Sequence, residues 1–154
     1  MKLFGERVVP VCSPGLIAKR PLDKPEDLRD FVLLHFEDSA QATPWISWEV
    51  WFEVMKMKPV SGRGVLRFSH YDQLVRAAVN GQGVALGRLP LIAGLLQDGT
   101  LVMPLRGLRF ATTAADRAYW LIVSQAAAAR SEVQTFAQWL RGQATAMAQP
   151  NSAV

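Results

Sequence analysis

The sequence predicts an α/β fold with a mostly parallel sheet. Short apolar segments of strand length alternate along the chain with segments whose apolar residues recur at helical spacing. Half of the 154 residues are apolar and 19% are charged, and no internal repeat is visible. This composition is typical of a chain that folds around a core and excludes an intrinsically disordered one. Helices on both faces of a sheet would explain why the strand segments are almost continuously apolar.

The expected strands are short and are bounded by Gly, Pro and Ser. They span residues 8–12, 32–36, 65–68, 84–86, 101–104 and 119–124. Pro10 has no N–H to donate, which predicts that the first of these strands lies at an edge of the sheet. The segment 119–124 (YWLIVS) is rich in aromatic and β-branched residues and predicts the best-formed strand of the chain.

Helices are expected between these strands. They begin at Pro25, span 45–57, 73–80 and 91–97, and begin again at Ser131. Asp72 is expected to be the N-cap of the third, and Gly81 to be its C′ residue. Ser131 and Gln134 have the spacing of a capping box at the start of the last helix.

Composition excludes several classes of protein. No apolar run approaches the length of about 18 residues that a membrane span needs. The residues before 8 are too short and polar to be a signal peptide, and one cysteine cannot form an intramolecular disulfide, so we expect a cytoplasmic protein. The net charge is +4, but the basic residues are interleaved with acidic ones, which argues against direct contact of this chain with nucleic acid.

The residues that could perform catalysis or bind a metal have simpler explanations. His35 and His70 lack the spacing of a metal site, so we expect no metal and no cofactor. Cys12 has no base beside it in the sequence and is expected to be a buried thiol. Glu37 and Asp38 could be a carboxylate pair, but adjacent acids after a strand are usually loop residues or helix caps. We therefore expect no catalytic residues and no enzyme.

Two further patterns also favour structural roles. The glycines in residues 81–87 (GQGVALG) end a helix and enter a strand, whereas a phosphate-binding loop follows a strand and opens a helix. The aromatic cluster of Trp45, Trp48, Trp51 and Phe52 lies on one side of a helix and predicts core packing rather than a stacking platform.

Several stretches, taken together and in order, resemble the effector-binding region of LysR-type transcriptional regulators. The resemblance is to the subgroup of glycine-cleavage and β-lactamase activators and covers residues 3–141. The matching stretches are ERVVPVCSP, PEDL, VLLHFED, W..W, DQLVRAAVNGQGVALGRLPLI, DGTLVMPL, AYWLIVS and F..WL. The resemblance implies a fold like the type-2 periplasmic binding proteins, in which two α/β lobes enclose a small molecule in an interlobe cleft.

The resemblance also implies how the chain is divided. Residues 1–14 would be a crossover strand and a remnant of the first lobe, 15–88 the complete second lobe, 89–148 the return to the first lobe with the last helix, and 149–154 a disordered tail. Nothing resembles the family's winged helix-turn-helix, so we expect the chain to be a fragment or the product of a truncated gene. The protein would bind DNA only through a winged helix-turn-helix that this chain lacks. We expect exposed apolar surface on 119–124 and on the last helix to drive formation of a homodimer or a higher homo-oligomer.

Carried over to this chain, the family's cleft implies a set of effector-binding residues. These are Cys12, Ser13, Phe36, Glu37, Ser69, His70, Gly87, Arg88 and Tyr119. Arg88 could hold a carboxylate in a bidentate pair, because effectors of the family are mostly small carboxylates, amino acids or aromatic acids. Two alternatives stay open: a solute-binding component of a transport system with the same fold, and a small α/β enzyme that depends on His70 or Glu37.

Overall fold

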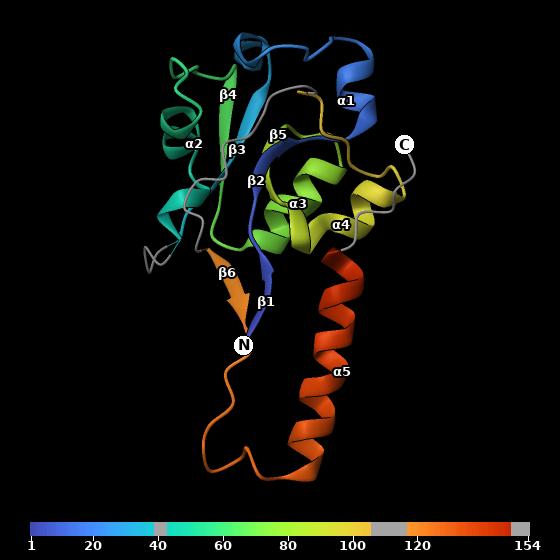
Figure 1. The fold of residues 1–154 in the computed structure, drawn as a ribbon. Coiled ribbons are helices and arrows are strands. Elements are labelled where there is room, and N and C mark those ends of the chain that lie inside the picture. The colour runs from blue at the N-terminus through green and yellow to red at the C-terminus, as the bar shows by residue number, and fades with distance from the viewer. Residues whose placement is uncertain (39–42, 106–116, 149–154) are drawn as a thin grey trace. The chain divides into compact units, whose positions relative to one another are not determined.

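A computed structural model describes residues 1–38, 43–105 and 117–148 of the chain. Two compact units are formed (Figure 1). The larger unit is Val8–Thr113, and the smaller one combines Met1–Arg7 with Ala114–Val154. The expected disordered tail at 149–154 lies outside the described residues.

The larger unit is built on a four-stranded sheet with the order β2-β5-β3-β4. Its strands are β2 (Val8–Val11), β3 (Val32–Phe36), β4 (Gly64–Phe68) and β5 (Val84–Arg88). β3 runs parallel to both β4 and β5, whereas β2 runs antiparallel to β5. The expected edge position of the Pro10 strand is confirmed, since β2 is the outer neighbour of β5.

Helices cover both faces of this sheet (Figure 1). On one face lie α1 (Pro14–Ala18), the 3₁₀ turns η1 (Pro25–Asp30) and η2 (Pro44–Ile46), and α2 (Trp48–Val54). On the other face lie α3 (Tyr71–Val79) and α4 (Leu89–Gln97). The α/β class and the parallel pairing at the centre of the sheet are therefore confirmed.

Two apolar cores follow from the alternation of side chains along the strands. Leu33 points into the core beneath α2, and Leu34 points into the core beneath α3 and α4. The first core contains Trp48, Trp51 and Phe52, all at most 4% exposed, which confirms that the aromatic cluster packs in the interior. The indole N–H of Trp48 donates to the buried Leu34 carbonyl at 3.1 Å and so ties α2 to the sheet.

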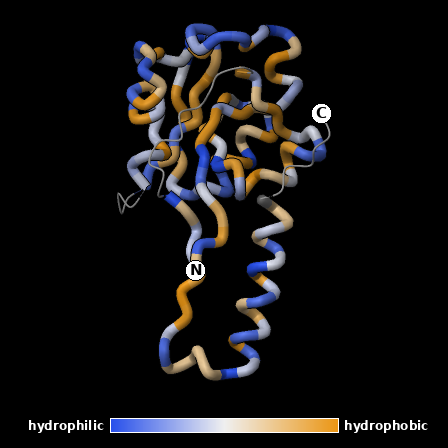
Figure 2. The backbone as a smooth tube through the Cα atoms, in the orientation of Figure 1, coloured by the Kyte–Doolittle hydropathy of each residue, from blue (hydrophilic) through white to orange (hydrophobic). Residues whose placement is uncertain are grey.

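The smaller unit contains a two-stranded antiparallel sheet and one long helix. β1 (Lys2–Gly5) pairs with β6 (Ala118–Trp120), and α5 (Ser131–Ala148) packs against β1. The sequence did not predict β1. Figure 2 shows hydrophobic residues directly after β6 and at intervals along α5.

Several expected elements differ in the structure. The helix expected over 45–57 is divided at Ser47, whose side-chain oxygen accepts the Val50 N–H at 3.1 Å and caps α2. The segment 101–104 forms only an isolated bridge between Val102 and Cys12. The strand expected over 119–124 ends at Trp120, because no described strand lies beside the residues after Leu121.

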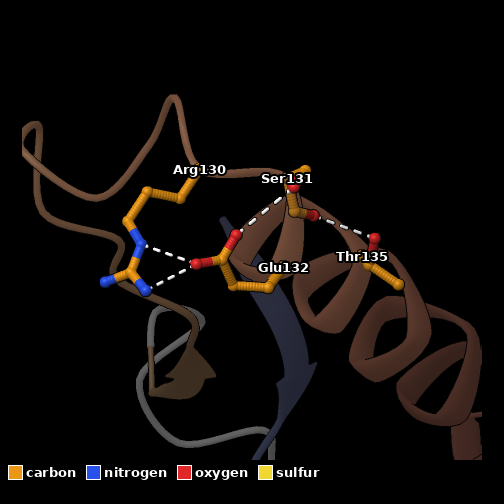
Figure 3. A network of polar contacts seen from close by, with 4 residues as sticks. All are labelled: Arg130, Ser131, Glu132 and Thr135. Atoms are coloured by element: carbon orange, nitrogen blue, oxygen red, sulfur yellow. Dashed lines mark hydrogen bonds and ion pairs between the residues drawn. The ribbon is translucent and has the colours of Figure 1, made fainter.

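Two helix starts also differ. His70, not Asp72, is the N-cap of α3. The capping box at Ser131 does not form, because the Gln134 side chain donates to the Ala128 carbonyl and the Ser131 hydroxyl donates to Glu132 (Figure 3). The pKa of the Glu132 carboxyl is lowered by its own backbone N–H and by Arg130. The expected helix end at Gly81 is confirmed, with φ at +71°.

None of the described helices is long and apolar enough to cross a membrane.

Candidate functional site

The carboxyl ends of β3, β4 and β5 lie at one edge of the larger unit's sheet, because these strands run parallel. The residues that follow them are therefore brought together. Glu37 follows β3 and donates its backbone N–H to the Phe68 carbonyl of β4 at 2.8 Å. Ser69 and His70 follow β4, and Arg88 is the last residue of β5.

β3 and β5 separate at this edge. Their ladder contains only the pairs Leu33–Val84 and Leu34–Ala85, although both strands continue beyond it. The chain leaves β3 towards α2 on one face of the sheet and leaves β5 into α4 on the other. Such a switch in topology at the carboxyl edge is where open α/β sheets place their ligands.

Tyr71 lies where β3 and β5 separate. Its hydroxyl accepts the backbone N–H of Arg88 at 2.7 Å and lies 3.3 Å from the Leu86 carbonyl, to which it donates. The Arg88 guanidinium lies over the Tyr71 ring, 5.6 Å from its centroid, in a cation–π arrangement. The ring of Phe36 meets that of Tyr71 edge-on at 5.8 Å. Arg88 is thus contacted by Tyr71 through both its backbone and its side chain.

Polar side chains extend this edge over β4. The Ser69 hydroxyl lies 3.1 Å from Nδ1 of His70, and both are exposed. The Glu37 carboxylate accepts a hydrogen bond from Arg67 at 2.7 Å. The Asp38 carboxylate accepts both the backbone N–H and the hydroxyl of Thr43 at 2.8 Å, as expected for a loop acid. The edge therefore offers hydroxyl, imidazole and guanidinium donors beside one acid.

Cys12 and Ser13, also predicted to contact the effector, do not lie at this edge of the larger unit's sheet. β2 is antiparallel to β5, so that Val8 lies opposite Arg88 while Val11 lies opposite Ala85. Cys12 and Ser13 follow Val11 and therefore lie towards the opposite edge of the sheet. Cys12 is fully buried, and its burial raises the thiol pKa to about 12, so that it remains protonated.

Gly87 lies at the edge, but its lack of a side chain is explained by packing. A Cβ at this position would meet the side chains of Ile92 at 2.5 Å and of Val11 at 2.8 Å. The glycine thus lets α4 and β2 approach β5 closely.

Tyr119 belongs to the smaller unit. Its ring packs against that of Phe4, with the centroids 4.7 Å apart, and its hydroxyl donates to the Glu6 carboxylate at 3.2 Å.

The two histidines do not form a metal site. Within the described ranges, no group of three or more His, Cys, Asp or Glu side chains could hold an ion. Burial lowers the pKa of His35, with Arg67 adding to this effect and Glu49 and Glu37 opposing it. His35 is therefore a neutral, half-buried strand residue near pH 7.

A hollow of about 320 Å³ lies elsewhere in the larger unit. Its walls come from α1, the segment before η1, and residues 102–104, and include Pro14, Ile17 and Met103. None of the sequence-predicted site residues lines it.

Sequence reasoning missed Tyr71 and Arg67. Tyr71 directly follows the Ser69-His70 pair, so its place after a strand was a usable signal. Its contact with Arg88 was not visible in the sequence, because it depends on β5 lying beside β3 rather than beside β4.

The family model described as "LysR substrate binding domain" matches residues 1–145. The chain belongs to this family. The LysR substrate-binding domain resembles, at 30% identity over 94% of its length, the glycine cleavage system transcriptional activator of Escherichia coli. It is 37% identical over 67% of its length to the E. coli HTH-type transcriptional regulator PerR, and 30% identical over 92% to the regulator DsdC. It spans less than half of each of these relatives: 45%, 32% and 44%.

Solved structures confirm the fold. The effector domain of the transcriptional regulator AmpR of Pseudomonas aeruginosa matches 95% of this LysR domain with a TM-score of 0.66 and 26% identity, over 65% of that chain. The AmpR effector-binding domain of Citrobacter freundii matches 95% with a TM-score of 0.63 and 20% identity, over 67% of that chain. The expected likeness to type-2 periplasmic binding proteins is thereby confirmed, and the relatives give no support for a transport component.

Proposed function

We propose that this LysR effector-binding domain senses a small carboxylate or an amino-acid-like molecule. Binding would control DNA-dependent transcription through a DNA-binding domain outside this chain. Two of the relatives are named as HTH-type regulators, and we propose a DNA-binding domain of that type. The observation that carries the proposal is Arg88, which lies at the carboxyl edge where the ladder between β3 and β5 stops.

The chemistry of this edge favours a carboxylate. A guanidinium can hold a carboxylate with two parallel hydrogen bonds, and Ser69 and His70 provide further hydrogen-bonding groups at the end of the next strand but one. α3 and α4 both begin at this edge, and the N-terminal ends of their dipoles also favour negative charge.

An amino-acid effector would also contact the acidic side chain at this edge through its α-ammonium group. Glu37 carries the one carboxylate among the proposed contacts, and it is already paired with a cation, Arg67. An α-ammonium group could replace or join that cation while the α-carboxylate meets Arg88. In the proposed arrangement the effector lies at the carboxyl edge of the larger unit's sheet and packs against Phe36 and Gly87 there.

A ligand that only binds does not regulate. The effector must favour one arrangement of the domain over another, since a ligand with equal affinity for both shifts nothing. The proposed role of the domain is regulation through effector binding and not catalysis.

The test is a thermal-shift screen with the twenty common amino acids, acetate, succinate and benzoate. A ligand that binds only the native state raises the apparent stability, by about 2.7 kcal/mol at a concentration of 100 times Kd. Arg88→Ala and Ser69→Ala are each expected to abolish the shift. Arg130→Ala is the matched control, because Arg130 is an exposed arginine of the smaller unit that pairs with Glu132. Equal shifts in all four proteins would overturn the placement of the site.

We also propose that the chain self-associates through the smaller unit. Trp120 and Ile122 are 56% and 87% exposed, and Phe136 and Trp139 on α5 are each 56% exposed. A two-stranded sheet is marginal on its own, and apolar surface of this kind favours a second copy of the chain.

A further inference from the structure

Tyr71 is held in an unusual position at the end of β5. Backbone groups of a strand normally bond to the neighbouring strand, but the ladder with β3 stops at Ala85. The Tyr71 hydroxyl donates to the Leu86 carbonyl and accepts the Arg88 N–H. It therefore provides the hydrogen bonds that a neighbouring strand would otherwise make to the end of β5.

The same side chain supports the guanidinium. The Tyr71 ring lies 5.6 Å from the Arg88 Cζ and is itself braced edge-on by Phe36. Fixing an arginine side chain costs conformational entropy, because rotation about several bonds is lost. Part of the ligand's binding free energy must offset this cost unless the protein already holds the side chain in place. A stacked arginine has part of this cost removed before the ligand arrives.

We propose that Tyr71 is a positioning residue for Arg88, which sets the selectivity of the site for carboxylates over their neutral analogues. The proposal rests on the proposed function, because it assumes that Arg88 meets the ligand. Tyr71 itself is not required to touch the ligand. It acts by fixing the backbone at the end of β5 through its hydroxyl and the guanidinium through its ring.

Amide hydrogen exchange followed by NMR tests the first part without any ligand. Tyr71→Phe keeps the ring but removes the hydroxyl, so the Arg88 amide is expected to exchange at least about 10-fold faster while the Val84 amide is unchanged. Thr145→Val is the control, because its hydroxyl also bonds to a backbone carbonyl, that of Arg141 on α5. An Arg88 amide that exchanges equally in wild type and Tyr71→Phe would overturn the proposed fixation.

Titration with glycine, acetate, benzoate and succinate, each beside its neutral amide, tests the second part. Tyr71→Phe is expected to weaken carboxylate binding about 3- to 10-fold and to leave binding of the amides unchanged. In an Arg88→Gln background the same substitution is expected to have no further effect on carboxylate binding, because no cationic side chain is left at residue 88 to be positioned. A purely structural role would instead lower carboxylate and amide binding together and persist in that background.

The outcomes separate the two proposals. If wild type binds none of these carboxylates, the carboxylate-sensing function fails, and the selectivity assigned to Tyr71 fails with it, while the exchange data still decide whether Tyr71 fixes the end of β5. If wild type binds a carboxylate and Tyr71→Phe binds it equally well, the function stands and the positioning role is wrong. Tyr71→Leu, which removes the ring as well, is expected to weaken carboxylate binding further than Tyr71→Phe.

Discussion

The Glu37 carboxylate accepts a hydrogen bond from Arg67 at 2.7 Å, and so joins the carboxyl ends of β3 and β4. The two side chains are 56% and 61% exposed, so water and salt screen their attraction. We predict that Glu37→Gln lowers the free energy of unfolding by less than about 1 kcal/mol, and that molar salt removes the difference. Urea unfolding at low and high salt measures this, and a loss of several kcal/mol would show that the pair is more than a surface contact.

A second prediction concerns ligand choice at the same residue. Glu37→Gln removes the negative charge that would attract an ammonium group but leaves the shape of the side chain. We expect it to weaken binding of glycine and to leave acetate binding equal or stronger, as measured by calorimetry. Glu53→Gln is the matched control, since Glu53 is an exposed acid on α2 away from the edge. Equal loss for both ligands would argue against an amino-acid effector.

Cys12 gives a pH-dependent prediction. Burial raises its pKa from 9.0 to about 12, because the thiolate is poorly solvated in the core. The unfolded chain therefore releases this proton at lower pH than the folded one. The contribution to stability is fully present below about pH 9 and is lost as the pH rises towards 12. Urea unfolding between pH 8 and 11 should show that the free energy of unfolding falls as the pH rises. In Cys12→Ala this fall should be smaller, because the contribution of the thiol is absent.

The same burial predicts that the thiol is protected from reagents. Native protein should react with iodoacetamide far more slowly than protein unfolded in urea. Rapid labelling of native protein at neutral pH would contradict the buried position of Cys12.

Gly83 is predicted to be intolerant of a side chain. Gly83 is itself buried in the turn that leads into β5, and a Cβ there would lie 2.4 Å from the Val32 carbonyl oxygen and 2.9 Å from the Leu34 side chain. Gly83→Ala should lower the free energy of unfolding by about 2–4 kcal/mol. Gly94→Ala is the control in helix α4, where nothing lies within 4 Å of the added Cβ, and it should stabilise by about 0.5–1 kcal/mol. Equal unfolding midpoints for the two variants would contradict the close approach.

Much of the larger unit could be predicted from local patterns. Apolar runs bounded by Gly and Pro located β2, β3 and β5, because buried residues give these strands a clear pattern. β4 was also located, although its residues are half-buried or exposed. Helix ends were less predictable. Ser47 is a favoured N-cap residue that the longer helical pattern over 45–57 concealed, whereas His70 makes no side-chain cap bond and carries no such signal.

The smaller unit was harder to predict, for a different reason. The apolar content of 119–124 predicted a long strand, but strand length depends on a partner, and β1 provides only a four-residue one. The positions of the candidate residues were predicted in part, because strand ends located Glu37, Ser69, His70 and Arg88 at one edge. The antiparallel direction of β2 moved Cys12 away from it, and no local pattern encodes that direction.

The exposed aromatic residues of α5 give the last prediction. The rings of Phe136 and Trp139 pack against each other, with centroids 5.6 Å apart, while each side chain remains 56% exposed. Burying such surfaces against a second copy would contribute about 25 cal/mol for each Å² of apolar area removed from water. Trp139→Ser is therefore expected to shift the chain towards the monomer, as measured by sedimentation velocity over a range of concentrations. Leu91→Ser removes a similarly exposed apolar side chain, 49% exposed, from α4 of the larger unit and should leave the distribution unchanged. Wild type that sediments as a monomer at every concentration, or a Trp139→Ser variant that associates as wild type does, would show that this surface is not where the copies meet.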